Sequence, residues 1–336
     1  MNKLPTLAMG FGVYQKMSKR RHIKFWRYYK EWIETYKDGQ IQDVTYAKYL
    51  MVQKQIKNLV PDLYLDEMTR RDVQRLINKY GETHERTTVL DFLHHIQAPL
   101  RDAVYEGWIA KDPTYKVVAT SHKKHKKTRN LYLEKDEVDK LVDVFQKDDS
   151  WLADMCDFDL RTGLRYAEAL GLTPKDVDLQ RLTVYVNKTW DYKTGEGFKK
   201  TKNVYSNRVI TIDWKAAQDI QKNLKGVKPD EPIFVKAFID SARPERPRNG
   251  KVYNSTVDSW LTAKCKEAGV SRITFHNLRH THASLLISAG VSIQSVAARL
   301  GHANTTTTQK TYIHLLDELK ARDNNKMMTA LTSLGG

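Results

Sequence analysis

A polar, strongly basic segment at residues 116–129 interrupts the hydrophobic pattern of this 336-residue chain and divides it into two parts. Within it, the run SHKKHKKTR at 121–129 has no apolar period, which predicts an exposed linker rather than a helix or strand. A chain of this length also exceeds what one ordinary hydrophobic core organises, so two domains are expected. The predicted parts are a basic tail at residues 1–22, a first domain at 23–115, the basic linker at 116–129 and a second domain at 130–336.

The first domain carries the three-to-four-residue period of helices along its length. Its opening helix presents one buried face at Ile23, Trp26, Tyr29, Ile33 and Tyr36. Further helices are predicted at Thr45–Leu59, Thr69–Tyr80 and Thr83–Glu106. Thr69 is expected as an N-cap and Gly81 as a stop, and Pro99 is expected to kink or split the helix that contains it. The sequence therefore predicts a small all-helical bundle.

The second domain combines helical periods with a short region of alternating apolar residues. Helices are predicted at Leu133–Gln146 and at Trp151–Gly171, the latter interrupted near Thr162–Gly163. Two strands follow, marked by Leu182, Val184 and Val186 and by Val209, Ile210 and Ile212. Helices resume near Trp214, Thr256, Phe275 and Ser292 and beyond Thr311. The whole chain is thus expected to be mainly α with a small antiparallel β-sheet, in which a helical domain precedes an α+β domain.

The charge balance indicates a polyanionic partner. The chain has 56 Lys and Arg residues against 40 Asp and Glu residues, a formal net charge of +16. Nucleic acid is a commoner reason for such an excess than an anionic membrane surface, although a basic face that only favours solubility is the alternative. The linker charges are expected to follow a phosphate backbone, or else to belong to a hinge with incidental lysines; they are Lys123, Lys124, Lys126, Lys127 and Arg129.

Two further features indicate the compartment. No apolar run is long enough to cross a bilayer, so no membrane partner is expected. The two cysteines, Cys156 and Cys265, lie among helix-like residues and are expected to be buried thiols of a reduced protein. We therefore expect a cytoplasmic protein, associated with the nucleoid if its polyanionic partner is DNA.

Four segments gather cations and imidazoles that a fold by itself does not need. In TGLRYAEALGL, at 162–172, Arg165 lies among apolar residues, and Glu168 one turn later can supply its counter-ion. In KKTKNVYSNR, at 199–208, a lysine cluster occupies a predicted hairpin. Taken alone, the first segment is explained by a structural Arg–Glu pair and the second by a solvated turn.

The other two segments lie near the end of the chain. In HNLRHTHAS, at 276–284, His276 shares a helix face with Arg279 and His280. Zinc binding is disfavoured because the glutamate of an HEXXH motif is missing and the guanidinium repels a cation, so a phosphate site fits better. In LGHANTTTTQKTYIHL, at 300–315, Gly301 is expected to end a helix next to His302, and Tyr312 to start another helical stretch.

Together these segments supply the parts of a phosphodiester reaction. In-line attack needs a nucleophile, a proton donor for the leaving oxygen and positive charge around the equatorial oxygens. Two forked guanidiniums can hold both nonbridging oxygens in place of metal ions. A tyrosine is a usable nucleophile in a cationic pocket, and its phosphate ester stores the bond energy for rejoining. Neither a metal nor another cofactor is therefore expected.

The set TGLR-x-x-E, H-x-L-R-H-T, LGH and the final tyrosine, spread over residues 130–333, resembles the tyrosine recombinase family, of the phage and integrative-element integrase type. The helical region at 23–115 resembles the core-DNA-binding (SAM-like) domain of that family. The resemblance implies catalytic roles for Arg165, His276, Arg279, His302 and the nucleophile Tyr312, with Glu168 in support. The hairpin lysine that it implies as general acid is Lys200, and Lys202 is its rival because the spacing to Ser206 and Arg208 is longer than in the family pattern.

The resemblance also implies an assembly and a reaction. The two domains would close on double-stranded DNA at attachment core sites, and a C-terminal tail helix would pack on its own core or dock in a neighbouring subunit. A homotetramer would exchange strands through a 3′-phosphotyrosyl intermediate and a Holliday junction, integrating or excising a phage or mobile element. A host bending factor and an excisionase stay open as further partners. Only some 22 residues precede the core-binding helices, so the arm-binding domain of many phage integrases is expected to be absent or truncated.

Other functions remain open at this point. A Xer-type resolving recombinase shares the same residues, and the KTK-type hairpin and the TTTTQKTYIHL ending favour a mobile-element integrase over it. A type IB topoisomerase uses a similar set but acts as a monomer on one duplex. A non-catalytic DNA-binding protein has no need of a tyrosine nucleophile.

Overall fold

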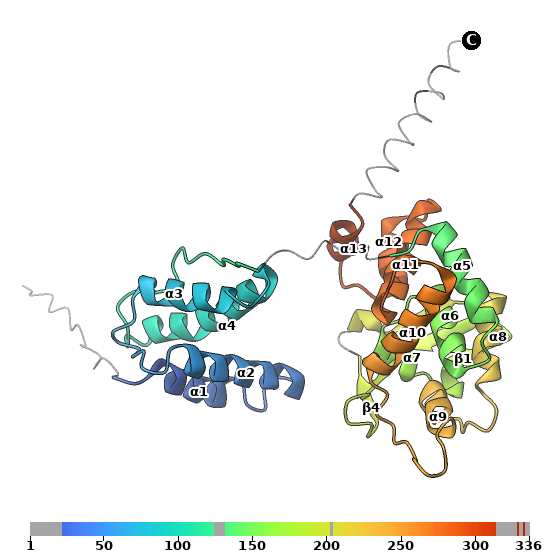
Figure 1. Ribbon diagram of the computed structural model, residues 1–336, viewed down its shortest axis with the longest axis horizontal. Coiled ribbons are helices and arrows are strands. Elements are labelled where there is room, and N and C mark those ends of the chain that lie inside the picture. Colours follow the sequence, from blue (N-terminus) through green and yellow to red (C-terminus); the bar gives the residue numbers. More distant parts are fainter. Residues whose placement is uncertain (1–21, 124–131, 202–203, 314–327, 329–331, 333–336) are drawn as a thin grey trace, which may run out of the picture. The chain divides into compact units, whose positions relative to one another are not determined.

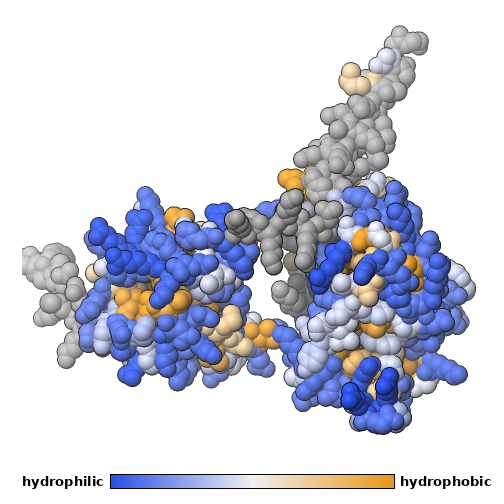
Figure 2. All heavy atoms as spheres, in the orientation of Figure 1, coloured by the Kyte–Doolittle hydropathy of each residue, from blue (hydrophilic) through white to orange (hydrophobic). Residues whose placement is uncertain are grey.

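The computed structural model describes residues 22–123, 132–201, 204–313, 328 and 332, and these residues fall into two compact units that meet in the sequence between Lys127 and Thr128. Each unit contains its own cluster of buried apolar side chains. On the face seen in Figure 2, hydrophilic residues cover most of the surface of both units. None of the helices in the described ranges is long and apolar enough to span a membrane.

The N-terminal unit is built of helices, as predicted (Figure 1). These are α1 (Phe25–Tyr36), α2 (Asp43–Leu59), α3 (Arg70–Gly81) and α4 (Arg86–Tyr105). Thr69 is the N-cap of α3 and forms a reciprocal capping box with Asp72, which confirms the predicted start of this helix.

Pro99 lies inside α4, so of the two predicted outcomes, a kink or a split, the split does not occur. A proline has no N–H to bond the carbonyl four residues earlier, and here that carbonyl belongs to His95. The hydroxyl of Tyr29, on α1, donates to the His95 carbonyl at 3.4 Å, and Tyr28 donates to the Pro99 carbonyl at 2.6 Å. Packing against α1 therefore supplies a hydrogen bond that the helix loses at Pro99.

The first residues of the predicted linker lie along α3. The backbone N–H of Val118 donates to Gln74, and that of His122 donates to the carbonyl of Gly81. A Cβ at position 81 would lie 2.1 Å from the carbonyl oxygen of Thr120, so only glycine permits this approach. Residues 117–122 thus belong to the N-terminal unit. Lys123 is exposed, and the other predicted phosphate-binding residues of the linker, Lys124, Lys126, Lys127 and Arg129, lie outside the described residues.

The C-terminal unit is mainly helical, with two small antiparallel sheets. Its helices are α5 (Lys135–Gln146), α6 (Trp151–Thr162), α7 (Tyr166–Leu170), α8 (Trp214–Lys222), α9 (Ile233–Asp240), α10 (Asn254–Ala268), α11 (Phe275–Ser288), α12 (Ile293–Leu300) and α13 (Thr305–Thr311). Its strands are β1 (Val177–Asp178), β2 (Thr183–Val186), β3 (Lys188–Trp190), β4 (Phe198–Lys200) and β5 (Arg208–Thr211). Single 3-10 turns lie at Pro174–Asp176 and Val204–Ser206.

The alternating apolar residues form strands as expected. Strand β2 pairs with β5, with Val184 opposite Ile210, and β1 completes this sheet on the other side of β2. The two predicted strands thus lie in one sheet, and strands β3 and β4 form a second, separate two-stranded sheet. The mainly α fold with small antiparallel sheets is confirmed.

Helix α6 is the centre of this unit. It packs against α5, α8, α9 and α11, and its residues from Ala153 to Leu160 are buried on every side. Cys156 on α6 and Cys265 on α10 are buried free thiols, as predicted. Because α6 is enclosed, the residues that follow its C-terminal end at Gly163 begin in the interior of the unit.

The sequence did not predict α9 or α13. Helix α13 consists of TTTTQKT, which has no apolar period, and Tyr312 directly follows it as the C-cap. The predicted tail helix beyond Tyr312 lies almost entirely outside the described residues.

Candidate active site

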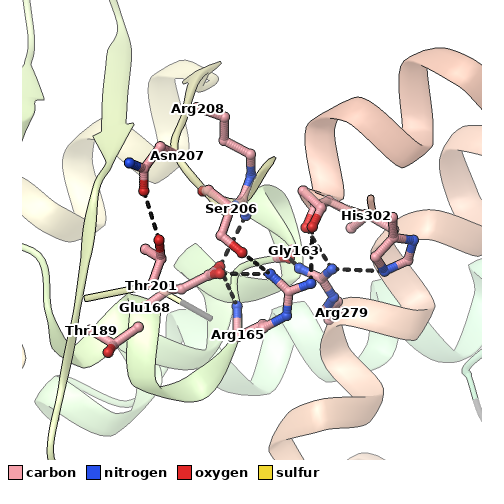
Figure 3. A network of polar contacts seen from close by, with 12 residues as sticks. Gly163, Arg165, Glu168, Thr189, Thr201, Ser206, Asn207, Arg208, Arg279 and His302 are labelled. Atoms are coloured by element: carbon pink, nitrogen blue, oxygen red, sulfur yellow. Dashed lines mark hydrogen bonds and ion pairs between the residues drawn. The ribbon is translucent and has the colours of Figure 1, made fainter. Parts of the chain in front are cut away.

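Arg165 enters the site at the junction of α6 and α7. Helix α6 ends at Gly163, which has a φ of +67°, and Arg165 is the N-cap of α7. The guanidinium donates from Nη1 to Glu168 Oε1 at 2.7 Å and from Nη2 to the carbonyl of Gly301 at 3.1 Å. The predicted Arg165–Glu168 pair is therefore present, but the arginine also extends to the far end of another helix (Figure 3).

Glu168 joins two arginines rather than one. Its Oε2 accepts from Arg208 Nη2 at 3.0 Å, while Oε1 accepts from Arg165. The residue is 1% exposed. Burial opposes the charged form, but Arg208 and Arg165 outweigh it, and the pKa of Glu168 is lowered. Glu168 is thus an ionised counter-charge beneath the site.

Arg208 is a site residue to which the sequence assigned no role. It lies at the start of β5, and its buried guanidinium donates from Nε to the carbonyl of Arg299 at 2.6 Å and from Nη1 to that of Ser206 at 2.8 Å. It thereby joins β5, α7 and α12 through Glu168 and Arg299. The only signal in the sequence was its place in the S-x-R pattern after the hairpin lysines.

Arg279 is the most deeply buried cation of the site. It is 3% exposed on α11, and it donates from Nη1 to the carbonyl of Gly163 and from Nη2 to that of Leu300, both at 2.6 Å. Burial, together with the positive charge of Arg165, lowers the pKa of Arg279 to about 9, which keeps it protonated at neutral pH.

The two predicted arginines therefore meet at one helix end. Arg279 bonds the carbonyl of Leu300 and Arg165 that of Gly301, which are consecutive residues at the C-terminus of α12 (Figure 3). The unpaired carbonyls and the negative end of the helix dipole favour cations at this position. Segments more than a hundred residues apart in the chain thus place two forked donors side by side.

His302 completes this group. Gly301 ends α12 in the left-handed conformation, with a φ of +68°, as predicted. His302 Nε2 lies 3.0 Å from Arg279 Nη2, and its Nδ1 lies 2.7 Å from Thr308 Oγ1 on α13. Burial and the charge of Arg279 lower the pKa of His302 to about 4, so the ring is neutral at neutral pH. Since the guanidinium can only donate, Nε2 accepts and the ring proton resides on Nδ1.

His276 and His280 lie together on α11, as their spacing predicted. The two rings are perpendicular, with their centroids 4.8 Å apart. His276 is exposed, and desolvation by nearby protein together with Arg279 and Arg165 lowers its pKa. Within the described ranges, no three His, Cys, Asp or Glu side chains are grouped as a metal site requires.

Tyr312 is docked against the same helix. Its ring is 2% exposed and packs in a cluster with Ala283, Ile287, Val296 and Leu300. Its hydroxyl lies 2.8 Å from His280 Nδ1. Burial raises the pKa of Tyr312, and Arg279 opposes this shift. In this arrangement the phenol is protonated.

Lys200, the predicted hairpin lysine, is more exposed than the arginines of the site. Lys200 is the last residue of β4, opposite Lys188 in β3, and it is exposed. In the described part of the chain it makes no ion pair with the arginine–histidine group. Its rival Lys202 lies outside the described residues.

Replacement of Glu168 by glutamine tests the arginine bridge. We expect the free energy of unfolding to fall by about 3–5 kcal/mol, because Arg165 and Arg208 lose their shared counter-charge. The exposed Lys264–Glu267 pair is the control, and Glu267→Gln should cost less than about 1 kcal/mol. Chemical denaturation of the intact chain measures both, and equal effects would contradict the bridge.

The bridge also predicts a pH dependence. A lowered carboxyl pKa stabilises the fold fully above the ordinary glutamate value of about 4.3, and this contribution is lost as the pH falls through the folded-state pKa. The difference in stability between the natural chain and Glu168→Gln should therefore shrink in acid. A difference that grows in acid would contradict the lowered pKa.

The fold and the site together define a class of protein. Residues 131–318 match the phage integrase family, and residues 24–117 match the phage integrase SAM-like domain. The chain belongs to the phage integrase family and is a site-specific recombinase of the tyrosine type. The resemblance that the sequence motifs indicated is thus confirmed.

Similar proteins include integrases of mobile elements. The integrase of Staphylococcus phage L54a is 27% identical over 90% of this chain and 92% of its own length. A tyrosine recombinase of Thermosipho africanus is 26% identical over 89% of this chain and 93% of its own length. Among solved structures, the Tn1549 transposon integrase in complex with transposon right-end DNA has the same fold, with a TM-score of 0.71 and 20% identity over 90% of this chain and 99% of that chain. The family match and the phage integrase support the integrase type.

Proposed function

We propose that this recombinase cuts and rejoins double-stranded DNA through a covalent bond between Tyr312 and a 3′-phosphate, and thereby integrates and excises a mobile element. The observation that carries the proposal is the meeting of Arg165, Arg279 and His302 at the C-terminal end of α12. The two neighbouring guanidiniums repel each other, and an anion that lies between them would relieve this repulsion.

Arg165 and Arg279 are the proposed clamp on the nonbridging phosphate oxygens. Both guanidiniums are held by backbone carbonyls, so their forks are oriented before DNA arrives and need little rearrangement. The Nδ1–H of His302 now bonds Thr308, and we propose that His302 hydrogen-bonds the scissile phosphate in the complex.

Proton transfer completes the reaction. We propose Lys200, which ends β4, as the general acid that protonates the leaving 5′ oxygen, with Lys202 two residues later in the sequence as its rival. His276, which is exposed on the face of α11 next to Arg279, is the proposed assistant in proton transfer. Metal ions are not required by this scheme, since the guanidiniums supply the positive charge.

Both units are proposed to contact the DNA. We propose that the helical unit up to residue 122 and the catalytic residues 130–336 each bind the attachment core, joined by the basic segment at 123–129. The net charge of +16 supports contacts with the phosphate backbone. Four copies would exchange one strand pair at a time through a Holliday junction, with a host bending factor or an excisionase as additional partners.

Covalent trapping tests the proposal. The intact chain is incubated in EDTA with a nicked duplex that carries the attachment core of its own element. After cleavage, the short fragment that carries the 5′-hydroxyl dissociates from this duplex, so the strand cannot be rejoined. We expect an adduct that survives denaturation, and mass spectrometry of its peptides should locate the nucleotide on Tyr312. An adduct on another residue would contradict the assignment, and tight binding without any adduct would favour a non-catalytic protein.

A further inference from the structure

The hydroxyl of the proposed nucleophile contacts a histidine that the proposed mechanism leaves unused. Tyr312 OH lies 2.8 Å from Nδ1 of His280 and 3.3 Å from the His280 carbonyl. The phenol carries a single proton, and the shorter contact is to the ring nitrogen. The geometry thus offers that proton two acceptors, of which the ring nitrogen is the nearer.

Both partners are held in place by the fold. His280 follows Arg279 directly on α11, and the bonds of Arg279 to Gly163 and Leu300 hold this turn of the helix in place. The Tyr312 ring is wedged between α11 and α12 by the apolar cluster that contains Ile287 and Val296. The contact therefore joins two rigid elements and is not a chance meeting of surface side chains.

We propose that His280 is a further catalytic residue, the general base that accepts the proton of Tyr312 as the phenolic oxygen attacks phosphorus. This inference rests on the proposed function of Tyr312. In the step, the Tyr312 O–H bond breaks and an N–H bond forms at His280 Nδ1, while the Tyr312 oxygen bonds phosphorus. The bond from phosphorus to the 5′ oxygen breaks, and that oxygen takes its proton from the hairpin lysine. On rejoining, the His280 imidazolium returns the proton to Tyr312.

The surroundings keep His280 in the accepting form. The groups that face it are His276 and Arg279 on its own helix, His302 after α12, and Tyr312 after α13. Burial, then His276 and Arg279, lower the pKa of His280 to about 4. The ring is therefore neutral at neutral pH, and in the tautomer that carries its proton on Nε2 the Nδ1 lone pair accepts from Tyr312.

DNA binding would ease the transfer. A phosphate between Arg165 and Arg279 offsets the positive field that disfavours an imidazolium, so the basicity of His280 rises when substrate is bound. The cationic pocket at the same time favours the developing charge on the phenolic oxygen. The histidine thus gains basicity at the stage of the reaction that uses it.

His276 is a poorer candidate for this role. It is exposed, and its contact is with the ring of His280 rather than with Tyr312. Its position on the outer face of α11 suits a group that serves the phosphate or the leaving oxygen. We therefore assign the two histidines different roles: His280 accepts the proton of Tyr312, and His276 assists proton transfer at the phosphate or the leaving oxygen.

The test compares His280→Gln and His280→Leu on a nicked suicide duplex that carries the attachment core with a 5′-bridging phosphorothiolate at the cleaved position. Sulfur leaves without protonation, so variants of the leaving-group acid, such as Lys200→Ala, should recover on this substrate. Glutamine can accept the hydrogen bond of Tyr312 but cannot take its proton. We expect both His280 variants to cleave about 100-fold more slowly or worse, without recovery on the sulfur substrate.

The pH profile separates a base from a positioning residue. Without a base, the reactive species is the phenolate, so cleavage by His280→Gln should rise about tenfold per pH unit between about pH 6 and pH 9. The natural chain should vary far less over this range. If His280→Gln retains the natural rate and profile, His280 only positions Tyr312 and the inference is overturned.

Failure of the inference and failure of the proposed function give different results. If Tyr312→Phe still forms the adduct, the nucleophile is misassigned and the proposed function fails with it. If Tyr312→Phe is inactive while His280→Gln cleaves normally, only the general-base role fails. Thermal unfolding of each variant shows whether a loss of activity reflects a loss of fold.

Discussion

Replacement of Tyr312 by phenylalanine is expected to abolish the covalent DNA adduct while leaving the fold and the affinity for DNA nearly unchanged. The ring packs in the apolar cluster between α11 and α12, and phenylalanine preserves those contacts. Only the hydrogen bond to His280 is lost, at a cost of about 0.5–1.5 kcal/mol. Because no other atom takes the place of the phenolic oxygen, covalent chemistry should fall below detection on denaturing gels.

The matched control for this prediction is Tyr253→Phe. Tyr253 is half exposed beside the start of α10 and takes no part in the site, so its variant should form the adduct at the natural rate. DNA affinity is measured separately by gel shift. An adduct that persists in Tyr312→Phe, or one that disappears equally in Tyr253→Phe, would contradict the proposed role of Tyr312.

Truncation of Arg279 should have the second largest effect. Arg279→Ala removes a proposed phosphate donor and leaves the carbonyls of Gly163 and Leu300 without their guanidinium partner. Loss of one preorganised donor to the transition state typically costs about 10²–10³-fold in rate. We expect adduct formation to fall by at least that factor, and the free energy of unfolding to fall by about 1–3 kcal/mol because of the unsatisfied carbonyls.

The variant Arg279→Lys distinguishes charge from geometry. Lysine keeps the positive charge but has no planar fork, so it cannot donate to both carbonyls, His302 and a phosphate oxygen in fixed directions. We expect it to recover stability better than activity. Arg272→Ala, an exposed change in the loop before α11, is the control and should cleave normally. Full activity in Arg279→Lys would show that the fork is not needed.

Much of the secondary structure followed from local patterns. Thr69 caps α3 because its hydroxyl and Asp72 satisfy the first N–H groups of the helix, a pairing that short sequence spacing specifies. The alternation around Val184 and Ile210 predicted two strands, because one face of each strand is buried. Helix α13 escaped prediction because four threonines carry no apolar period, and it is stabilised by packing against α12.

At Pro99, local rules predicted a possible split that the helix does not have. Local rules place a helix break at a proline, yet α4 continues through it. The compensating hydroxyl of Tyr29 comes from a helix more than sixty residues earlier. No rule that considers only neighbouring residues can supply that partner.

The sequence by itself determined which residues could carry the chemistry. Arg165, Arg279, His302 and Tyr312 were recognisable because residue types and short spacings are properties of the chain. Only the tertiary structure decided that Arg165 and Arg279 bond consecutive carbonyls at the end of α12, that Glu168 also serves Arg208, and that Tyr312 rests on His280. The physical reason is that hydrogen bonds and ion pairs act over a few ångströms, and the packing of α6, α11 and α12 decides which distant segments come within that range.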